Sequence, residues 1–490
     1  MADNHAAAPL YLALDQGGSG CRALVFNKRG ERVAEARRTL RTMIDGSRIE
    51  LDGNELVSGL RSAAEEALAQ LGESQTRVEA AALATQRSNI ICWRRSSGEP
   101  LSPVLSWQDR RAADRLAGLD ATLVKTHTGL FPNAHYGASK IAWCLEHLPA
   151  VRQAQCDGDL LVGPMASFIA SRLTTSPALA DPVNASRTLL WHLEHHDWDT
   201  TLCHHFAIDP HLLPPAVDSD HGFGRLRLEG LELPLEIVTG DLAAAAFANG
   251  PPSSDQAIIT LGTGAFVQRP LAEPSGHPRL LDGVLWHSAR GSCLSLEGTV
   301  NGAGNAIAWL AGRHGISVRA IEENLACWLE KIEEPPLFLN AVAGLGSPLW
   351  CADEVPRFDR EEKLPEQAVA LLESILFLLL LNLCEMESEL PALEEIVVNG
   401  GISAVDGVCQ RLADLTGISV VRSDEREGTA RGLAALLCDC GDRWPRQESR
   451  FEPRQNQALH ARFERWQHFM QQELSPHCHY YNCTPRRGHG

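Results

Sequence analysis

The sequence lacks several features that would place it in a specialised class of protein. No uninterrupted apolar run approaches the roughly 20 residues needed to cross a bilayer, and the longest, residues 375–381, is predicted to lie in a buried helix. The N-terminal segment MADNHAAAPL lacks the basic stretch and apolar core of a secretory signal. Short-period repeats are also absent. We therefore expect a cytoplasmic protein without a membrane partner.

Positive charge is scarce. The chain has 44 Lys and Arg against 62 Asp and Glu, which gives a formal net charge of −18. This balance disfavours nucleic acid as the main partner, although it leaves room for an anion held by backbone amides and a few local cations. The 14 cysteines are scattered and are expected to be mostly small buried apolar residues, as in a reducing compartment.

What is present is an ordinary globular composition in a chain too long for one core. The 490 residues are 44% hydrophobic and 22% charged, so two domains are expected. Strands and helices alternate, which predicts the α/β class. We place an N-terminal domain at 1–248, a C-terminal domain at 249–442 that begins with the linker NGPPSSD, and a loosely packed tail at 443–490. Helices are predicted at 54–71, 298–311, 366–390 and 426–438.

Two glycine-rich hairpins are the strongest local signals. In the first, Gly17 and Gly18 let the backbone approach a ligand closely. Ser19 adds a hydroxyl, Arg22 adds a positive charge, and Asp15 is a candidate carboxylate for Mg²⁺. The second hairpin, LGTGA at 261–265, repeats this pattern with Gly262, Thr263 and Gly264.

Neither hairpin matches a Walker motif or a GxGxxG turn, and each alone could be an ordinary tight turn. Two such cradles in two domains, however, indicate a nucleotide polyphosphate clamped between the domains.

Motifs along nearly the whole chain resemble those of the FGGY carbohydrate kinases, most closely the glycerol kinase branch. The segments that carry the resemblance, in family order, are the first hairpin, WQDRR (107–111), DPVNASRTLL (181–190), TGD (239–241), the GTG turn, LEGTVNGAG (296–304), VVNGG (397–401) and REGTARGLAAL (426–436). The resemblance implies two ribonuclease-H-like domains of the actin and hexokinase type around a central cleft. It also implies ATP, Mg²⁺ and transfer of the γ-phosphoryl group to a hydroxyl of a small polyol or sugar.

The resemblance assigns roles to individual residues. Asp241 corresponds to the base that accepts the proton of the substrate hydroxyl, although Asp at a helix start is also a common cap. Arg87 corresponds to an arginine that binds substrate hydroxyls, with a surface arginine as the alternative. Gly304, Gly400, Gly401 and Asp406 correspond to the nucleoside side. Glu427, Thr429 and Gly432 are expected to fix the last helix rather than to touch a ligand.

Three substrate-side positions depart from the glycerol kinase pattern. Ser88 replaces a glutamate and Leu242 replaces a glutamine. By the most direct alignment His135 replaces a tyrosine, with Tyr136 one residue later. The phosphate side is therefore better preserved than the polyol pocket. A pentulose kinase of the same fold and a non-catalytic nucleotide-binding regulator stay open as alternatives, and a homo-oligomer is left open as well.

Histidine and cysteine clusters give weak signals. The C-terminal residues include Cys438, Cys440, His477, Cys478, His479 and Cys483, in spacings that do not match zinc motifs. His195, His196, His204 and His205 lie in a polar stretch and are expected to be solvated.

Overall fold

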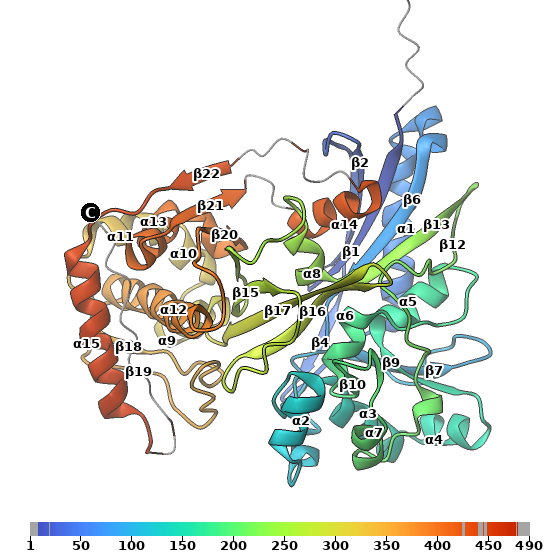
Figure 1. Ribbon diagram of the computed structural model, residues 1–490, viewed down its shortest axis with the longest axis horizontal. Coiled ribbons are helices and arrows are strands. Elements are labelled where there is room, and N and C mark those ends of the chain that lie inside the picture. The colour runs from blue at the N-terminus through green and yellow to red at the C-terminus, as the bar shows by residue number, and fades with distance from the viewer. Residues whose placement is uncertain are drawn as a thin grey trace, which may run out of the picture.

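The computed structural model describes residues 8–18, 20–423, 427–439, 444, 448–476 and 478. Two large mixed sheets, each flanked by helices, make up the molecule (Figure 1). Ser19, Cys440, His477, His479 and Cys483, which the sequence singled out, lie outside the described residues.

The first sheet has six strands in the order β12-β13-β6-β1-β2-β3. Strands β1 to β3 are antiparallel, and β6 and β13 run parallel to β1. The strands are β1 (Leu10–Gly17), β2 (Gly20–Asn27), β3 (Arg32–Thr39), β6 (Val78–Thr85), β12 (Arg225–Leu228) and β13 (Leu231–Gly240). β1 and β6 are apolar along almost their whole length because both of their faces are buried.

Helices and a smaller five-stranded sheet, in the order β4-β5-β8-β7-β9, complete the N-terminal region. Helix α1 begins after Asp52, whose carboxylate caps the amides of Asn54 and Glu55. The helices are α1 (Gly53–Ala69), α2 (Ala121–Thr128), α3 (Gly137–His147), α4 (Pro149–Cys156), α5 (Met165–Leu173), α6 (Pro182–Ala185), α7 (Thr200–His205) and α8 (Asp241–Ala246). The remaining strands are β4 (Thr42–Asp45), β5 (Arg48–Leu51), β7 (Ile90–Arg94), β8 (Val104–Leu105), β9 (Leu160–Pro164), β10 (Trp191–His192) and β11 (Asp197–Trp198).

The second sheet repeats the plan of the first. Its order is β16-β17-β15-β14-β20-β21-β22. The four strands from β16 to β14 are antiparallel to their neighbours, β20 and β21 run parallel to β14, and β22 is antiparallel to β21. The strands are β14 (Gln256–Leu261), β15 (Ala265–Leu271), β16 (Leu281–Ser288), β17 (Gly291–Val300), β20 (Glu395–Asn399), β21 (Ser419–Ser423) and β22 (Glu448–Phe451). The repeated topology is that expected of two ribonuclease-H-like domains.

The second sheet is covered by its own helices: α9 (Gly304–His314), α10 (Val318–Glu322), α11 (Leu325–Lys331), α12 (Leu364–Glu387), α13 (Asp406–Thr416) and α15 (Gln457–Glu473), beside the short pair β18 (Phe338–Leu339) and β19 (Arg357–Phe358). Helix α12 is long and apolar enough to cross a membrane, but 89% of its most apolar window is buried inside the protein. It is the central core helix of this half. The predicted helix at 298–311 is wrong at its start, because β17 continues to Val300.

The expected loosely packed tail is wrong for residues 448–476. β22 pairs antiparallel with β21, and Phe463 and Trp466 of α15 are completely buried. Arg462 of α15 donates two hydrogen bonds, of 2.7 and 2.8 Å, to the buried Glu373 carboxylate of α12. Farther along, Cys478 forms a disulfide with Cys351, so neither is the free buried thiol that the sequence analysis expected.

Helix α14 (Gly428–Cys438) connects the two halves. Although its sequence falls in the predicted C-terminal domain, Ala430, Leu433 and Ala434 pack in one cluster with Tyr11, Ala13 and other residues of the first sheet. Figure 1 shows α14 beside β1 and β6, far from α15. At Gly432 a side chain would collide with the backbone oxygen of Ala244 in α8, so glycine is required for this close packing.

Candidate active site

The carboxyl ends of the parallel strands of the first sheet bring three predicted residues together. In register, Asp15 of β1 lies opposite Ala84 of β6, and Thr85 lies opposite Gly240 of β13, which Asp241 follows. Asp15, Arg87 and Asp241 therefore gather at one edge of the sheet. This edge is where ligands bind in open α/β sheets.

Asp15 is a buried carboxylate with an unusual electrostatic environment. The pKa of Asp15 is raised to about 7, chiefly because the carboxyl group is buried; Asp241 and Glu427 contribute to the rise, and Arg22 opposes it. Arg22 Nη1 lies 3.6 Å from its carboxylate. Two interacting acids at a buried edge are a suitable environment for a divalent cation, which would favour their charged forms.

Arg22 also bonds to an acid from the other half of the chain. Its Nη1 donates a 2.6 Å hydrogen bond to Glu427, just before α14, and Arg37 Nη2 donates another of 2.6 Å to the same carboxylate. Glu427 therefore holds the start of α14 against the first hairpin, as the sequence analysis expected. Thr429 donates to the backbone oxygen of Asp241 at 3.3 Å.

Asp241 is the first residue of α8, and its Oδ1 accepts a 2.8 Å hydrogen bond from the amide of Leu242. Burial raises the pKa of Asp241, and the Arg87 guanidinium counteracts the shift. The side chain of Arg87 runs directly over Gly240, where a Cβ would lie 2.6 Å from Arg87 Cγ. Glycine before the aspartate thus brings a cation and a proton acceptor side by side.

A buried network of charges, which sequence reasoning missed, supports Arg87. Glu297 of β17 forms ion pairs with Arg187 and, at 3.6 Å, with Arg87 Nη1, and it accepts 2.9 Å hydrogen bonds from Gln268 and Ser295. Burial alone would raise the pKa of Glu297, but the two guanidiniums outweigh it and lower the pKa to about 2. The sequence did carry a signal for this network. Arg187 in NASRTLL and Glu297 in LSLEGTV are each the single charged residue of an otherwise uncharged segment.

The three substituted positions line the same region. Ser88 has a left-handed backbone conformation (φ 65°), which is rare for residues other than glycine, asparagine and aspartate. Among the described residues, the buried Ser88 Oγ and Arg87 Nη1 have no hydrogen-bond partner. The His135 ring packs on Trp107 and Tyr136, at centroid distances of 5.2 and 5.0 Å.

Lys140 holds this region together. Its buried Nζ donates to the backbone oxygens of Ser88, Ser106 and His135 at 2.8, 2.9 and 2.9 Å. Burial, Lys140 and three nearby arginines hold the pKa of His135 well below its usual value, so its imidazole is neutral at pH 7. A neutral imidazole can donate or accept a hydrogen bond from a hydroxyl group.

Glycine turns from three elements meet in the second half. A Cβ at Gly304 would lie 2.8 Å from the backbone oxygen of Gly262, and a Cβ at Gly400 (φ 94°) would lie 2.4 Å from that of Leu261. The Gly304 amide donates to Gly262 O at 2.9 Å. The GTG turn, the start of α9 and the end of β20 therefore form one backbone-lined surface, on which Thr263 is exposed.

The remaining nucleotide-side predictions have different surroundings. Asp406 begins α13 and forms an exposed 2.8 Å ion pair with Arg422, so its carboxylate already has a partner. A Cβ on Gly401 would meet open space. Neither Asp406 nor Gly401 takes part in close backbone contacts of the kind that allow only glycine at positions 304 and 400.

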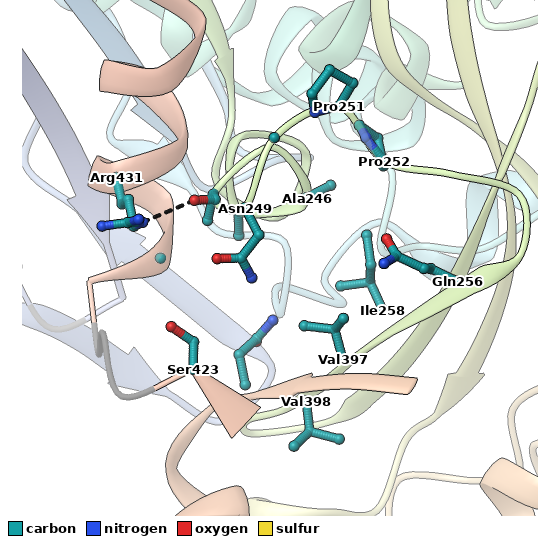
Figure 2. Close-up of a pocket in the computed structure, with 15 residues that line it drawn as sticks. Ala246, Asn249, Pro251, Pro252, Gln256, Ile258, Val397, Val398, Ser423 and Arg431 are labelled. Carbon is teal, nitrogen blue, oxygen red and sulfur yellow. Dashed lines mark hydrogen bonds between the residues drawn. The ribbon is translucent and has the colours of Figure 1, made fainter. Parts of the chain in front are cut away.

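A separate pocket lies where the predicted linker meets α14 (Figure 2). Figure 2 shows Asn249, Ile258 and Val397 around the opening, and Arg431 Nε donates a 2.9 Å hydrogen bond to Ala248 O. None of the predicted site residues lines this pocket, although the predicted linker and the VVNGG and REGTARGLAAL segments contribute to its wall. It lies at the end of α8 opposite to Asp241.

The two halves of the chain match the two domain models of one protein family. Residues 10–247 match the N-terminal domain model of the FGGY family of carbohydrate kinases, and residues 257–438 match its C-terminal domain model. A glycerol kinase from Rhodospirillum rubrum is 33% identical over 466 residues, covering 89% of this chain and 93% of its own. One from Trichlorobacter lovleyi is 34% identical over 447 residues, covering 87% and 88%.

Solved structures agree on the fold. The structure of Plasmodium falciparum glycerol kinase with ADP superposes with a TM-score of 0.84 at 21% identity and covers 96% of this chain and 99% of its own. A xylulose kinase from Rhodospirillum rubrum gives a TM-score of 0.82 at 18% identity and covers 94% and 98%. Two kinases with different substrates thus have the same architecture as this chain.

Proposed function

The chain belongs to the FGGY family of carbohydrate kinases and is a phosphotransferase with an alcohol group as acceptor; on this premise, we propose that it uses Mg²⁺-ATP to phosphorylate a small polyol or sugar larger than glycerol. The observation that carries this proposal is the cluster of Asp241, Arg87 and Asp15 at the end of the parallel strands. A cytoplasmic location and a homo-oligomer stay predictions.

Asp241 is the proposed general base. Phosphoryl transfer needs a substrate hydroxyl held in position, a group that takes its proton, and donors around the transferred group. The raised pKa of Asp241 makes it a better proton acceptor, and Arg87 beside it favours the ionised form that this role requires. Arg87 Nη1, which lacks a hydrogen-bond partner, is the proposed donor to a substrate hydroxyl.

The proposed nucleotide site is made mainly of backbone. Gly17 and Gly18 on one side, and Gly262, Thr263, Gly264, Gly304, Gly400 and Gly401 on the other, would hold the phosphates and nucleoside of ATP. Asp15 is the carboxylate proposed to hold Mg²⁺, which when bound would neutralise charge on the phosphates. Arg22 is hydrogen-bonded to Glu427. To bind phosphate, its guanidinium would have to break this bond or contact both groups at once.

The substrate proposal rests on the three substituted positions. Ser88 is much smaller than the glutamate of the glycerol kinase pattern, and Leu242 offers no polar atom in place of a glutamine amide. The loss of these partners weakens recognition of a small triol, because a pocket built to bond a hydroxyl discriminates strongly. The volume freed at Ser88 favours a four- or five-carbon polyol or ketose, which includes the pentuloses.

Asp241→Asn tests the function at its chemical centre. We expect kcat to fall by on the order of 10²–10⁴ in an ADP-release assay, because the general base is lost. Binding of the ATP analogue AMP-PNP, measured by calorimetry, should change little, since the phosphates contact other groups. Turnover within threefold of wild type would show that Asp241 is not the base.

A further inference from the structure

Two histidines and one aspartate converge on the side of the N-terminal half that carries α2 and α7. His127 lies in the last turn of α2, His192 in β10, and Asp199 directly before α7. One ligand atom from each lies within 4.8 Å of the others. In the part of the chain that the structure describes, no other group of His, Cys, Asp and Glu meets this condition.

The backbone holds these side chains in place. The Leu193 amide donates to His127 O at 2.8 Å, which joins α2 to the strand that carries His192. Asp199 Oδ1 caps α7 by accepting from the Leu202 amide at 2.8 Å. The other carboxylate oxygen, Oδ2, is thereby directed at His127 Nδ1, 2.6 Å away. The arrangement is therefore fixed before any ligand binds.

The donor atoms are in a form that can bind a metal. His192 Nδ1 accepts from the amides of Glu194 and His195 at 3.3 and 3.4 Å, which leaves Nε2 for a ligand. His195, exposed to solvent, stacks on His192 at a centroid distance of 3.8 Å.

We propose that His127, His192 and Asp199 bind one divalent transition-metal ion of the zinc class. Two imidazoles and a carboxylate are ligands that suit Zn²⁺, Co²⁺ or Ni²⁺, with water or His195 available for the fourth position. This site is separate from the cluster of Asp15, Arg87 and Asp241 and uses none of its residues.

The site would connect two segments of the substrate pocket. The chain from α2 leads directly into the loop that carries His135, and the chain that carries Arg187 leads into β10. A metal ion bound to His127 and His192 would tie these segments to each other. We therefore expect it to act structurally, by slowing the local opening of residues 129–136 and 187–199.

The competing interpretation is a hydrogen-bonded pair that needs no metal. The 2.6 Å contact between His127 and Asp199 satisfies both groups by itself. Asp199→Asn separates the two interpretations, because asparagine keeps an oxygen for the cap of α7 but removes the charged ligand. His192→Gln is a second variant that leaves the His127 contact unchanged.

The experiment uses the untagged, EDTA-treated full chain with Cys156→Ser and Cys327→Ser, which remove the thiols that are exposed in the described part of the chain. ZnCl₂ is titrated by calorimetry against a competing chelator, and CoCl₂ binding is followed by visible absorption. The matched control is His287→Gln. The ring centroids of His287 and His196 are 3.7 Å apart, and His287 Nε2 lies 3.7 Å from Asp218 Oδ1. These three residues do not form a group whose ligand atoms all lie within 4.8 Å of one another.

We expect one Zn²⁺ per chain and intense tetrahedral Co²⁺ bands in the background protein and in His287→Gln. Asp199→Asn and His192→Gln should each weaken binding by about 100-fold or more, since even outer-shell changes cost about 10–100-fold. Amide exchange at 129–136 and 187–199 should slow on adding Zn²⁺ only where the site is intact. Equal affinity in all four proteins, or no stoichiometric binding to the background protein, would overturn the proposal.

Discussion

The proposed nucleotide side and the proposed substrate side of this kinase differ in what forms them. The surface around Gly262, Gly304 and Gly400 is backbone, and it depends on the absence of side chains. The region around Arg87, Arg187 and Glu297 is a buried network of charged side chains. A surface formed by the backbone limits substitution only at the glycines that form it. A pocket formed by side chains can be changed by a substitution at any one of its residues. This difference explains how one fold can keep its phosphate chemistry while its substrate changes.

The largest effect on stability is expected from breaking the buried charge network. Glu297→Gln leaves Arg187 and Arg87 without their carboxylate, and removal of one partner of a buried pair costs about 3–5 kcal/mol. Chemical denaturation measures the loss in the free energy of unfolding. The control on the nucleotide side is Asp406→Asn, which breaks an exposed ion pair with Arg422 and should cost less than about 1 kcal/mol. Similar losses in both variants would remove the contrast between the two regions.

The same residue predicts a pH dependence. Because folding lowers the pKa of Glu297 from 4.5 to about 2, its charge stabilises the fold above pH 4.5, and this contribution disappears as the pH falls toward 2. The shift corresponds to about 3 kcal/mol. Glu297→Gln should lack this component of the acid destabilisation.

On the nucleotide side, the sharpest test is a pair of adjacent glycines. Gly400→Ala forces a left-handed residue and a contact with Leu261 O, which should cost about 1–3 kcal/mol and raise KM for ATP. Gly401→Ala has open space and should stay within about 0.5 kcal/mol of wild type. Thermal unfolding and ATP kinetics measure both. If the two variants behave alike, close backbone packing is not what this surface requires.

The smallest effect expected at neutral pH is the titration of Asp15. With a pKa of about 7, Asp15 is progressively protonated below pH 7, so KM for Mg²⁺-ATP should rise by up to about tenfold per unit of acidification and level off above pH 7. Asp15→Asn should retain only the titration of ATP itself. A wild-type profile that matches that of the variant would remove Asp15 from the metal site.

The sequence was sufficient for the parts of the molecule that local pattern determines. The two glycine hairpins and the long apolar helix α12 are contiguous signals, and each occurs where it was predicted. The network of Arg87, Arg187 and Glu297 was missed because its members are separated by 100 and 110 residues and meet only through the packing of β17.

Other errors had the same origin. The polar composition after residue 443 suggested loose packing, yet α15 buries one apolar face, including Phe463 and Trp466, in the core of the second half. The start of α9 was misplaced because β17 extends through LEGTV before the chain turns. Tertiary pairing determined these elements, and a single sequence does not display it.

The comparison of kcat/KM for glycerol with kcat/KM for four- and five-carbon polyols and ketoses tests the central claim most directly. We predict that wild type prefers a longer substrate, and that Ser88→Glu combined with His135→Tyr shifts the ratio at least about tenfold toward glycerol while KM for ATP is unchanged. A wild-type enzyme that prefers glycerol over every longer substrate, with a double variant that leaves the ratio unchanged, would contradict it.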